Sequence, residues 1–239
     1  MSKVLSLRDS SISLQALDLR RDNVLLGPHI LKKIVNYAIS HNVEQLGLCV
    51  IGEITRILPT MFSCHTLTHL KLCFFPNGDH KTLFPNSLNL PALSSLQLGS
   101  FKFCVGDDDR AEPFSGFNRL NSLLISNCTV GSGKTLCISS ATLVNLTVYN
   151  KFLNFYTIEL CTPILSTFAF TGTPYQKLDV SDALSLKHVD IFAEVIPYEK
   201  EPPLFLLIWL RKFLDIKSLT VSATTLQVYH VLMLFLLSS

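Results

Sequence analysis

One pattern of apolar residues recurs nine times along this chain of 239 residues and constrains its fold more than any other feature. The clearest copy spans residues 120–128, L-N-S-L-L-I-S-N-C, with apolar residues at its first, fourth and sixth positions. The copies begin at Leu14, Val43, Leu67, Leu93, Leu120, Leu143, Leu165, Leu186 and Ile216. The first and the last of the intervals between them are the longest. A period close to about 20–29 residues predicts a stack of equivalent units, each burying its apolar face against its neighbours.

The spacing L-x-x-L-x-L is typical of a leucine-rich repeat, in which the later two apolar residues point inward from a short strand. We therefore expect an α/β fold: a leucine-rich-repeat solenoid, or horseshoe, with a parallel concave sheet and an irregular or helical convex side. About nine repeats would fill residues 1–225 as one domain. We interpret residues 226–239 as an apolar C-terminal tail, a truncated repeat.

The segments that return from one predicted strand to the next differ in character. Apolar residues at helical spacing predict helices near residues 28–38 and 203–214. Residues 135–138 and 156–160 instead alternate apolar and polar side chains, which predicts strands on the convex side of the middle repeats. The return over residues 74–91 carries a Pro-Asn-Gly-Asp turn signal, and we expect a loop there.

The composition argues against several classes of function. The formal net charge is only +2 and the Lys and Arg residues are scattered, so nucleic-acid binding is not expected. The most apolar runs, 204–210 and 231–237, are shorter than the roughly 20 residues that a membrane span needs, so no membrane partner is expected either. Seven cysteines, an odd number, and a first segment unlike a signal peptide favour an intracellular protein, cytoplasmic or nuclear.

The segment from Gly131 to Thr135, Gly-Ser-Gly-Lys-Thr, ends like a nucleotide-binding P-loop. A full P-loop has another glycine five residues before Gly133, where this chain has Cys128. It also continues into a helix whose first amides hold phosphate, whereas the residues after Thr135 alternate as in a strand. We interpret the segment as a turn, and nucleotide binding stays open as an alternative.

The sequence predicts no catalytic residues, no cofactor site and no metal site. Residues 107–110, Asp-Asp-Asp-Arg, have neither the alternating ligands nor the final glutamate of a calcium loop. Cys64, His65, His69 and Cys73 lie in or beside one predicted strand, residues 67–72, where they do not easily form the two converging pairs of a zinc site. The histidines have no motif context for nucleophilic catalysis. We therefore expect a protein that is not an enzyme and has no cofactor.

Alternation along the predicted strands defines a candidate binding surface. Side chains between the inward apolar residues point to the concave face, which is where a repeat horseshoe presents its partner-binding residues. The candidate protein-binding residues are Asp18, Arg20, His69, Lys71, Gln97, Asn145, Tyr149, His188, Asp190 and Phe192. This face mixes charged, polar and mostly small residues. It suits a protein or peptide of unknown identity better than a phosphate-rich partner.

Several stretches are more specific than the generic repeat. They are residues 34–38 (IVNYA), 41–46 (HNVEQL), 58–72 (with FSCHTLTHLKL at its end), 120–128, 138–143 (ISSATL) and 165–172 (LSTFAFTG). These phrases resemble the plant F-box proteins with leucine-rich repeats, many of which end in an FBD domain. The resemblance covers nearly the whole chain.

The resemblance implies a role in ubiquitination. In that family an N-terminal F-box binds a Skp-type adaptor of a cullin-type ubiquitin ligase, and the repeats hold the protein to be modified. No segment here resembles the F-box or the FBD domain, so we expect adaptor binding only if a missing F-box is restored. The leading hypothesis is a protein-binding module that forms the substrate-recognition part of such a receptor. The alternatives are a nucleotide-binding protein and an inactive, truncated gene product.

Overall fold

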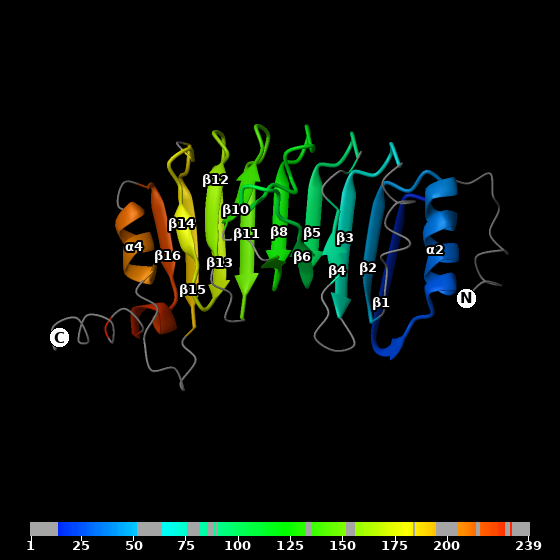
Figure 1. Cartoon of the computed structure of the whole chain (residues 1–239), viewed down its shortest axis with the longest axis horizontal. Helices are drawn as coiled ribbons and strands as arrows, with labels where there is room; N and C mark the ends of the chain where they lie inside the picture. Colours follow the sequence, from blue (N-terminus) through cyan, green and yellow to red (C-terminus); the bar gives the residue numbers. More distant parts are fainter. Residues whose placement is uncertain are drawn as a thin grey trace.

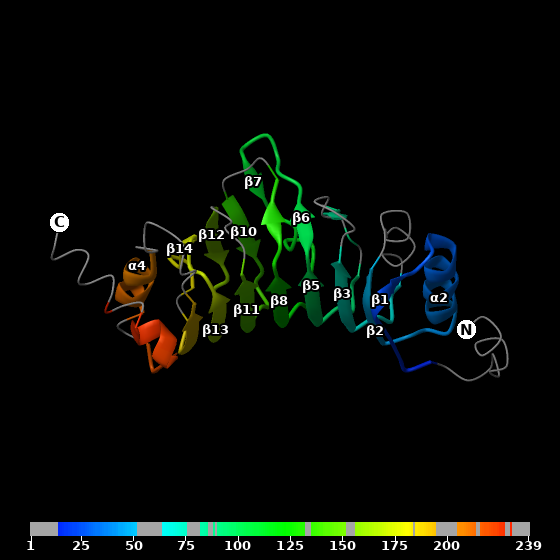
Figure 2. The ribbon, with the colours of Figure 1, turned by 90° about the horizontal axis from the view of Figure 1, so that it is seen from below.

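The computed structural model describes residues 14–51, 64–75, 82–85, 88, 90–131, 135–151, 156–183, 185–194, 205–213, 216–227 and 230. These residues form a solenoid of parallel strands (Figure 1). A nine-stranded sheet runs along one side, and two smaller sheets lie over one of its faces (Figure 2). The predicted solenoid with a parallel sheet is therefore confirmed.

The nine-stranded sheet takes one strand from each predicted repeat, in sequence order. The strands are β1 (Ala16–Leu25), β2 (Gln45–Ile51), β3 (His69–Phe75), β5 (Ser95–Gly99), β8 (Ser122–Ser126), β11 (Asn145–Asn150), β13 (Thr167–Gly172), β15 (His188–Ala193) and β16 (Ser218–Val221). Equivalent repeat positions pair across neighbouring strands; for example, Leu46 lies opposite Leu70, which lies opposite Leu96. The apolar residues therefore form continuous inward rows.

These inward rows make the core. Leu48, Leu72 and Leu98, which occupy one row, are completely buried. The first apolar residue of most repeats is also buried in the turn before its strand, as Leu93 and Leu143 illustrate. A single strand with two inward side chains could not exclude water alone, so burial depends on stacking each repeat on the next.

Strands also form much of the opposite side. A four-stranded sheet contains β7 (Arg110–Ala111), β10 (Thr135–Ser139), β12 (Thr157–Cys161) and β14 (Lys177–Asp179). A three-stranded sheet contains β4 (Thr82–Phe84), β6 (Phe101–Phe103) and β9 (Thr129–Val130). The strands predicted at 135–138 and 156–160 are confirmed. The middle of the solenoid is thus a parallel β-helix, and the expected irregular or helical convex side is wrong there. The middle repeats are shorter than the first and the last, and they leave little chain for a helix once both strands are made.

The predicted loop over residues 74–91 is also wrong at β4. Phe84 is completely buried and packs edge to face against Phe101 and Phe103 of β6, with ring centroids 5.5 and 5.8 Å apart. Such edge-to-face contacts stabilise the fold beyond the contribution from burying the rings. Burial of Phe84 therefore holds this short segment extended beside β6, despite the turn signal that precedes it.

Two of the helices occupy the two longest intervals between repeats, at the two ends of the sheet (Figure 1), and a short helical segment at residues 223–227 follows β16 (Ser218–Val221). Helix α2 (Pro28–Ser40) has a proline in its first turn and buries its apolar stripe, including Leu31 and Ile34. Helix α4 (Phe205–Lys212) buries Trp209, whose ring meets that of Phe170 edge-on at 4.7 Å. The indole Nε1 donates a hydrogen bond to the Gln176 carbonyl at 3.0 Å. Both predicted helices are confirmed.

Gly172 is the one glycine among the described residues with a positive φ, 128°. It ends β13 opposite Asn150 of β11. A Cβ atom at this position would lie 1.8 Å from the Asn150 carbonyl oxygen. Glycine is therefore required here both for the backbone conformation and for the close approach of the two strands.

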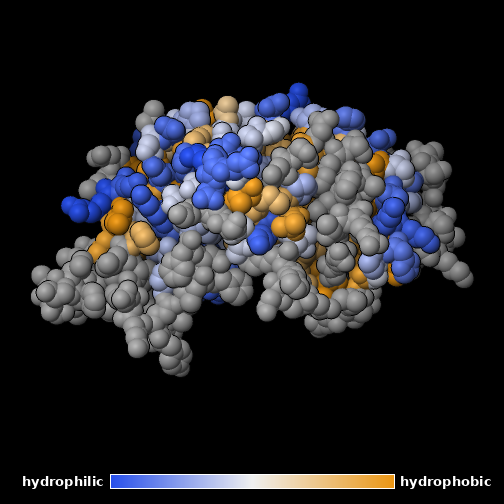
Figure 3. Space-filling view, in the orientation of Figure 1, coloured by the Kyte–Doolittle hydropathy of each residue, from blue (hydrophilic) through white to orange (hydrophobic). Residues whose placement is uncertain are grey.

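No helix within the described ranges is long and apolar enough to cross a membrane. Hydrophilic side chains gather over the middle of the face seen in Figure 3, with small apolar groups between them. Among the described residues, the exposed large apolar side chains are scattered over many elements: Ile30, Phe75, Leu83, Ile164, Phe192, Ile208, Leu219 and Leu226. Most of the predicted tail 226–239 lies outside the described residues.

Candidate functional site

The predicted concave face corresponds to the outward side of the nine-stranded sheet, turned away from the smaller sheets (Figure 2). We call it the open face. Its middle row contains Asp18, Gly47, Lys71, Gln97, Leu124, Thr147, Ala169, Asp190 and Thr220. Along β2 and β3 the inward side chains are buried, whereas the outward ones are half-buried or exposed. All ten candidate binding residues belong to outward rows.

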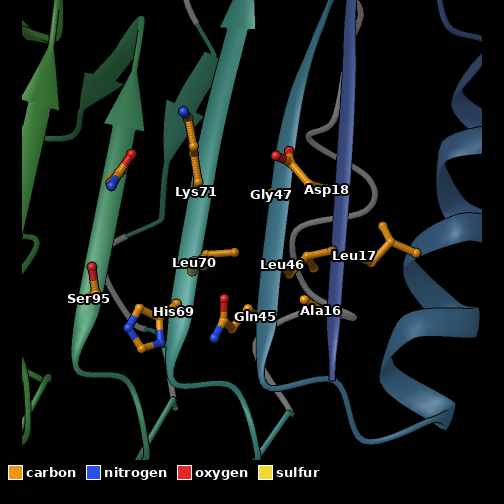
Figure 4. A pocket seen from close by; sticks show the side chains of 11 residues that line it. Ala16, Leu17, Asp18, Gln45, Leu46, Gly47, His69, Leu70, Lys71 and Ser95 are labelled. Atoms are coloured by element: carbon orange, nitrogen blue, oxygen red, sulfur yellow. The ribbon is translucent and has the colours of Figure 1, made fainter. Parts of the chain in front are cut away.

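The first half of the open face contains a groove across β1, β2, β3 and β5 (Figure 4). Its volume is about 220 Å³. Its lining comprises Ala16, Leu17, Asp18, Gln45, Leu46, Gly47, His69, Leu70, Lys71, Ser95 and Gln97. Four of the candidate residues line it: Asp18, His69, Lys71 and Gln97. Gly47 also lies in the row predicted to line the concave face, whereas Gln45 was not predicted to do so, although it occupies an outward repeat position.

Gly47 forms the floor of the groove. A Cβ atom at Gly47 would lie 2.6 Å from Oδ1 of Asp18, so the missing side chain creates the hollow between Asp18 and Lys71 (Figure 4). Asp18 is held by Arg20, whose Nη2 lies 2.7 Å from Oδ2. His69 is oriented by its neighbour, because its Nδ1 lies 2.9 Å from Oγ1 of Thr68. The groove thus presents a paired carboxylate on one wall and an ammonium group on the other.

Arg20 lies on β1, paired with Asp18 of the groove, and the other five candidates lie on β11 and β15. Tyr149 lies under the ammonium group of Lys151, 5.5 Å from its ring centroid, and that group is 3.6 Å from a carboxylate oxygen of Glu194. Phe192 is exposed, and His188 and Asp190 share its strand. Strand β8 separates this cluster from the groove. At about 4.8 Å per strand, β3 and β11 lie about 14 Å apart. The candidates therefore form two clusters, and a protein interface of ordinary size, about 800 Å² on each partner, would cover both.

The other motifs that the sequence suggested do not converge. Cys64 is buried in the turn before β3, with its Sγ 3.3 Å from Oγ1 of Thr66, whereas His69 points to the open face. Thr135 begins strand β10, where a P-loop would have a helix, and residues 132–134 lie outside the described residues. Asp108 accepts a hydrogen bond from the Arg110 backbone within a surface turn.

The structure does bring together three side chains that the sequence analysis missed. Cys137 of β10 and Cys161 of β12 point outward from the four-stranded sheet, with their Sγ atoms 3.6 Å apart. Cys161 lies 3.5 Å from Oε1 of Glu159, which accepts a hydrogen bond from Nη2 of Arg110 at 2.8 Å. The available signal was that Cys137 falls in one predicted convex strand and Cys161 directly follows the predicted convex strand of the next repeat.

Burial sets the protonation of these thiols. It raises the pKa of the Cys137 thiol, and it raises the pKa of Cys161 to about 12, with further contributions from Cys137 and Glu159. On the open face, burial likewise raises the pKa of Cys73, which faces Cys49 across β2 and β3, to about 12. These cysteines are therefore protonated, weakly nucleophilic thiols near neutral pH.

No family model, curated protein or solved structure matches this chain. The fold and the arrangement of the side chains define it as a parallel-strand solenoid. The resemblance to F-box proteins stays a prediction.

Proposed function

We propose that this chain is a leucine-rich-repeat module that binds a protein through its open face and recognises the substrate of an F-box-type ubiquitin ligase receptor. The observation that carries the proposal is the continuity of that face. Nine strands pair in register, and the outward side chains of the strands around the groove stay accessible. The role in ubiquitination rests on the sequence resemblance.

The repeat assignment is supported by the positions of the apolar residues. In all nine copies the fourth and sixth residues pair along the same two rows of the sheet, and in most copies they are buried, as Leu123 and Ile125 are; Leu219 on the edge strand β16 is exposed. Leucine-rich repeats require a strand and a return, and the return varies between helix and shorter structures. Strands on the convex side of the middle repeats are therefore compatible with the assignment.

The chemistry of the groove favours a polypeptide ligand. Its volume of about 220 Å³ is smaller than the roughly 300–1,000 Å³ typical of small-molecule sites, and it suits one or two inserted side chains. Lys71 on one wall would attract a carboxylate, while Gln45 and Gln97 offer amide donors and acceptors. We propose binding without catalysis. We also propose an intracellular location, because all seven cysteines are thiols.

The test compares two charge reversals on opposite sides of the solenoid. Lys71 lines the groove, whereas Lys102 is exposed on β6 of the three-stranded sheet. Partners would be identified by proximity labelling with the wild-type chain, then purified and titrated calorimetrically. We expect Lys71→Glu to weaken binding of such a partner at least about tenfold, which corresponds to about 1.4 kcal/mol, and Lys102→Glu to leave it unchanged. Equal binding by both variants would contradict a partner site in the groove.

Three further measurements separate the alternatives. Purified Skp-type adaptor should not bind residues 1–239, and its capture would contradict the prediction that an F-box is lacking. Saturable binding of ATP with Mg²⁺ that Lys134→Ala abolishes would favour the nucleotide-binding alternative. A broad melting transition of the purified monomer would favour the inactive gene product.

A further inference from the structure

The three side chains on the outside of the four-stranded sheet have the composition of a metal site. The ligand atoms of Cys137, Glu159 and Cys161 all lie within 4.8 Å of one another. Two adjacent strands hold them: Cys137 faces Glu159 across the ladder between β10 and β12, and Cys161 follows Glu159 by two residues on the same face. Strand positions restrict the movement of all three groups.

The distances agree with the edges of a tetrahedral zinc site. Zinc lies about 2.3 Å from thiolate sulfur and about 2.0 Å from carboxylate oxygen, so tetrahedral angles separate two sulfurs by about 3.8 Å and a sulfur from an oxygen by about 3.5 Å. The sulfurs of Cys137 and Cys161 are 3.6 Å apart, and that of Cys161 is 3.5 Å from Oε1 of Glu159. A small ion could enter with little rearrangement of the strands.

A disulfide fits this arrangement less well. Cys137 pairs with Glu159, and Cys161 pairs with Ser139, so the two cysteines are diagonal neighbours on the sheet. Diagonal neighbours have Cα atoms about 7–8 Å apart, beyond the usual limit of about 6.8 Å for a disulfide. A metal ion bonded to both sulfurs does not require the Cα atoms to come as close together as a disulfide does.

The surrounding charges suit a divalent cation. Two thiolates and a carboxylate would carry three negative charges, of which zinc balances two and Arg110 the third. Arg110 donates to this same Oε1 of Glu159 at 2.8 Å, and a carboxylate oxygen with two lone pairs can bind a metal while it keeps that hydrogen bond. It is also 3.6 Å from Glu112 and 3.9 Å from Asp108, so it keeps acidic neighbours if Glu159 turns. Hydrogen-bonded outer partners of this kind orient ligating carboxylates.

We propose that Cys137, Glu159 and Cys161 bind Zn²⁺, with water as the fourth ligand. Two thiolates select a borderline-soft ion over Mg²⁺ or Ca²⁺, which prefer oxygen ligands alone. The Glu159 side chain is 29% exposed, so an ion and its water can reach the site from solvent. Zinc would join β10 to β12 on the side of the solenoid opposite the groove.

The test uses the full chain, reduced and freed of metal, with Co²⁺ as an optical probe. Binding should produce the thiolate-to-cobalt absorption and the visible bands of a tetrahedral ion, and one equivalent of Zn²⁺ should abolish both. Cys137→Ser/Cys161→Ser should weaken Co²⁺ binding more than about 100-fold, because loss of ligands costs at least as much as loss of their outer partners. Cys49→Ser/Cys73→Ser, a matched pair of facing cysteines on the open face, should leave it unchanged.

Two milder variants keep the test decisive if the double variant does not fold. Cys161 is only half-buried, so Cys161→Ser alone should preserve the fold and remove most of the thiolate absorption. Glu159→Gln should keep the thiolate absorption but weaken binding at least about tenfold. Absence of a saturable cobalt spectrum, or the same spectrum and affinity in Cys161→Ser as in the wild-type chain, would overturn the proposal.

Discussion

The two ends of this solenoid and its middle share one sheet but support it differently. At the ends, helices α2 and α4 lie in the two longest intervals between repeats; in the middle, shorter intervals contain short strands instead. The inward rows of the nine-stranded sheet pass through both regions without a break in register. Position along the repeat therefore determines the shared sheet, whereas the length and pattern of each return determine what covers it.

The largest expected effect comes from breaking the sheet that both regions share. Gly172→Ala would place a methyl group 1.8 Å from the Asn150 carbonyl oxygen, at a backbone conformation that alanine disfavours. We expect a loss of about 5 kcal/mol or more in the free energy of unfolding, measured by urea denaturation, because the strands must separate. Gly116→Ala is the control, since its new Cβ would lie 3.8 Å from the nearest atom, the Leu88 carbonyl oxygen. Similar stability of both variants would contradict a close approach at Gly172.

The next effect should be confined to the helix-supported end. Trp209→Ala removes a completely buried ring, its contact with Phe170 and its hydrogen bond to Gln176. We expect a loss of about 3–5 kcal/mol. Stability in stacked repeats is largely local, so amide hydrogen exchange should accelerate in α4 and β16 before it changes in β8. Uniform acceleration along the chain would show that the regions unfold as one cooperative unit.

A smaller effect is expected in the strand-supported middle. Phe84→Leu keeps an apolar side chain at β4 but loses the edge-to-face contacts with Phe101 and Phe103. We expect a loss of about 1–2 kcal/mol, measured by urea denaturation. Hydrogen exchange should accelerate in β4 and β6, and α4 should stay protected. Loss of protection in α4 would contradict the separation of the two regions.

The smallest effect is expected where a convex strand, β14, meets helix α4. Asp179 of β14 accepts hydrogen bonds from the Ser181 hydroxyl and backbone, which lower its carboxyl pKa; the ammonium group of Lys212 in α4, 3.9 Å away, lowers it further. A lowered pKa contributes stability above the ordinary pKa of the carboxyl, and this is lost as pH falls through the folded pKa. Ser181→Ala should therefore raise the Asp179 pKa, observed by NMR titration. At pH 7 the substitution should lower the free energy of unfolding by less than about 1 kcal/mol, because the Asp179–Ser181 hydrogen bond is exposed.

The difference between Ser181→Ala and the wild-type chain should disappear below the folded pKa of Asp179, where the carboxyl is protonated in both. A constant difference in stability at all pH values would show that Ser181 acts through packing and not through the charge of Asp179.

Much of the sheet could be predicted from the repeat, because the spacing of its apolar residues determines which side chains point inward. Leu48, Leu72 and Leu98 are examples. The strand at Phe84 could not be predicted, because it depends on contacts with Phe101 and Phe103 in the next repeat and the local sequence indicates a turn. Candidate residues could be placed on the open face, but their separation into a groove around Gly47 and a cluster on β11 and β15 required the structure.

By itself, the sequence determined the number of repeats, the parallel sheet, the inward rows and helices α2 and α4. Each follows from the spacing of apolar residues in the local sequence, because that spacing decides which side chains of a strand or helix can be buried together. Only the tertiary structure decided the extended convex side, the groove and the cluster of Cys137, Glu159 and Cys161. The two cysteines are 24 residues apart in the chain, yet their sulfurs lie within 3.6 Å. The register between β10 and β12 produces that proximity, and register results from the packing of whole repeats.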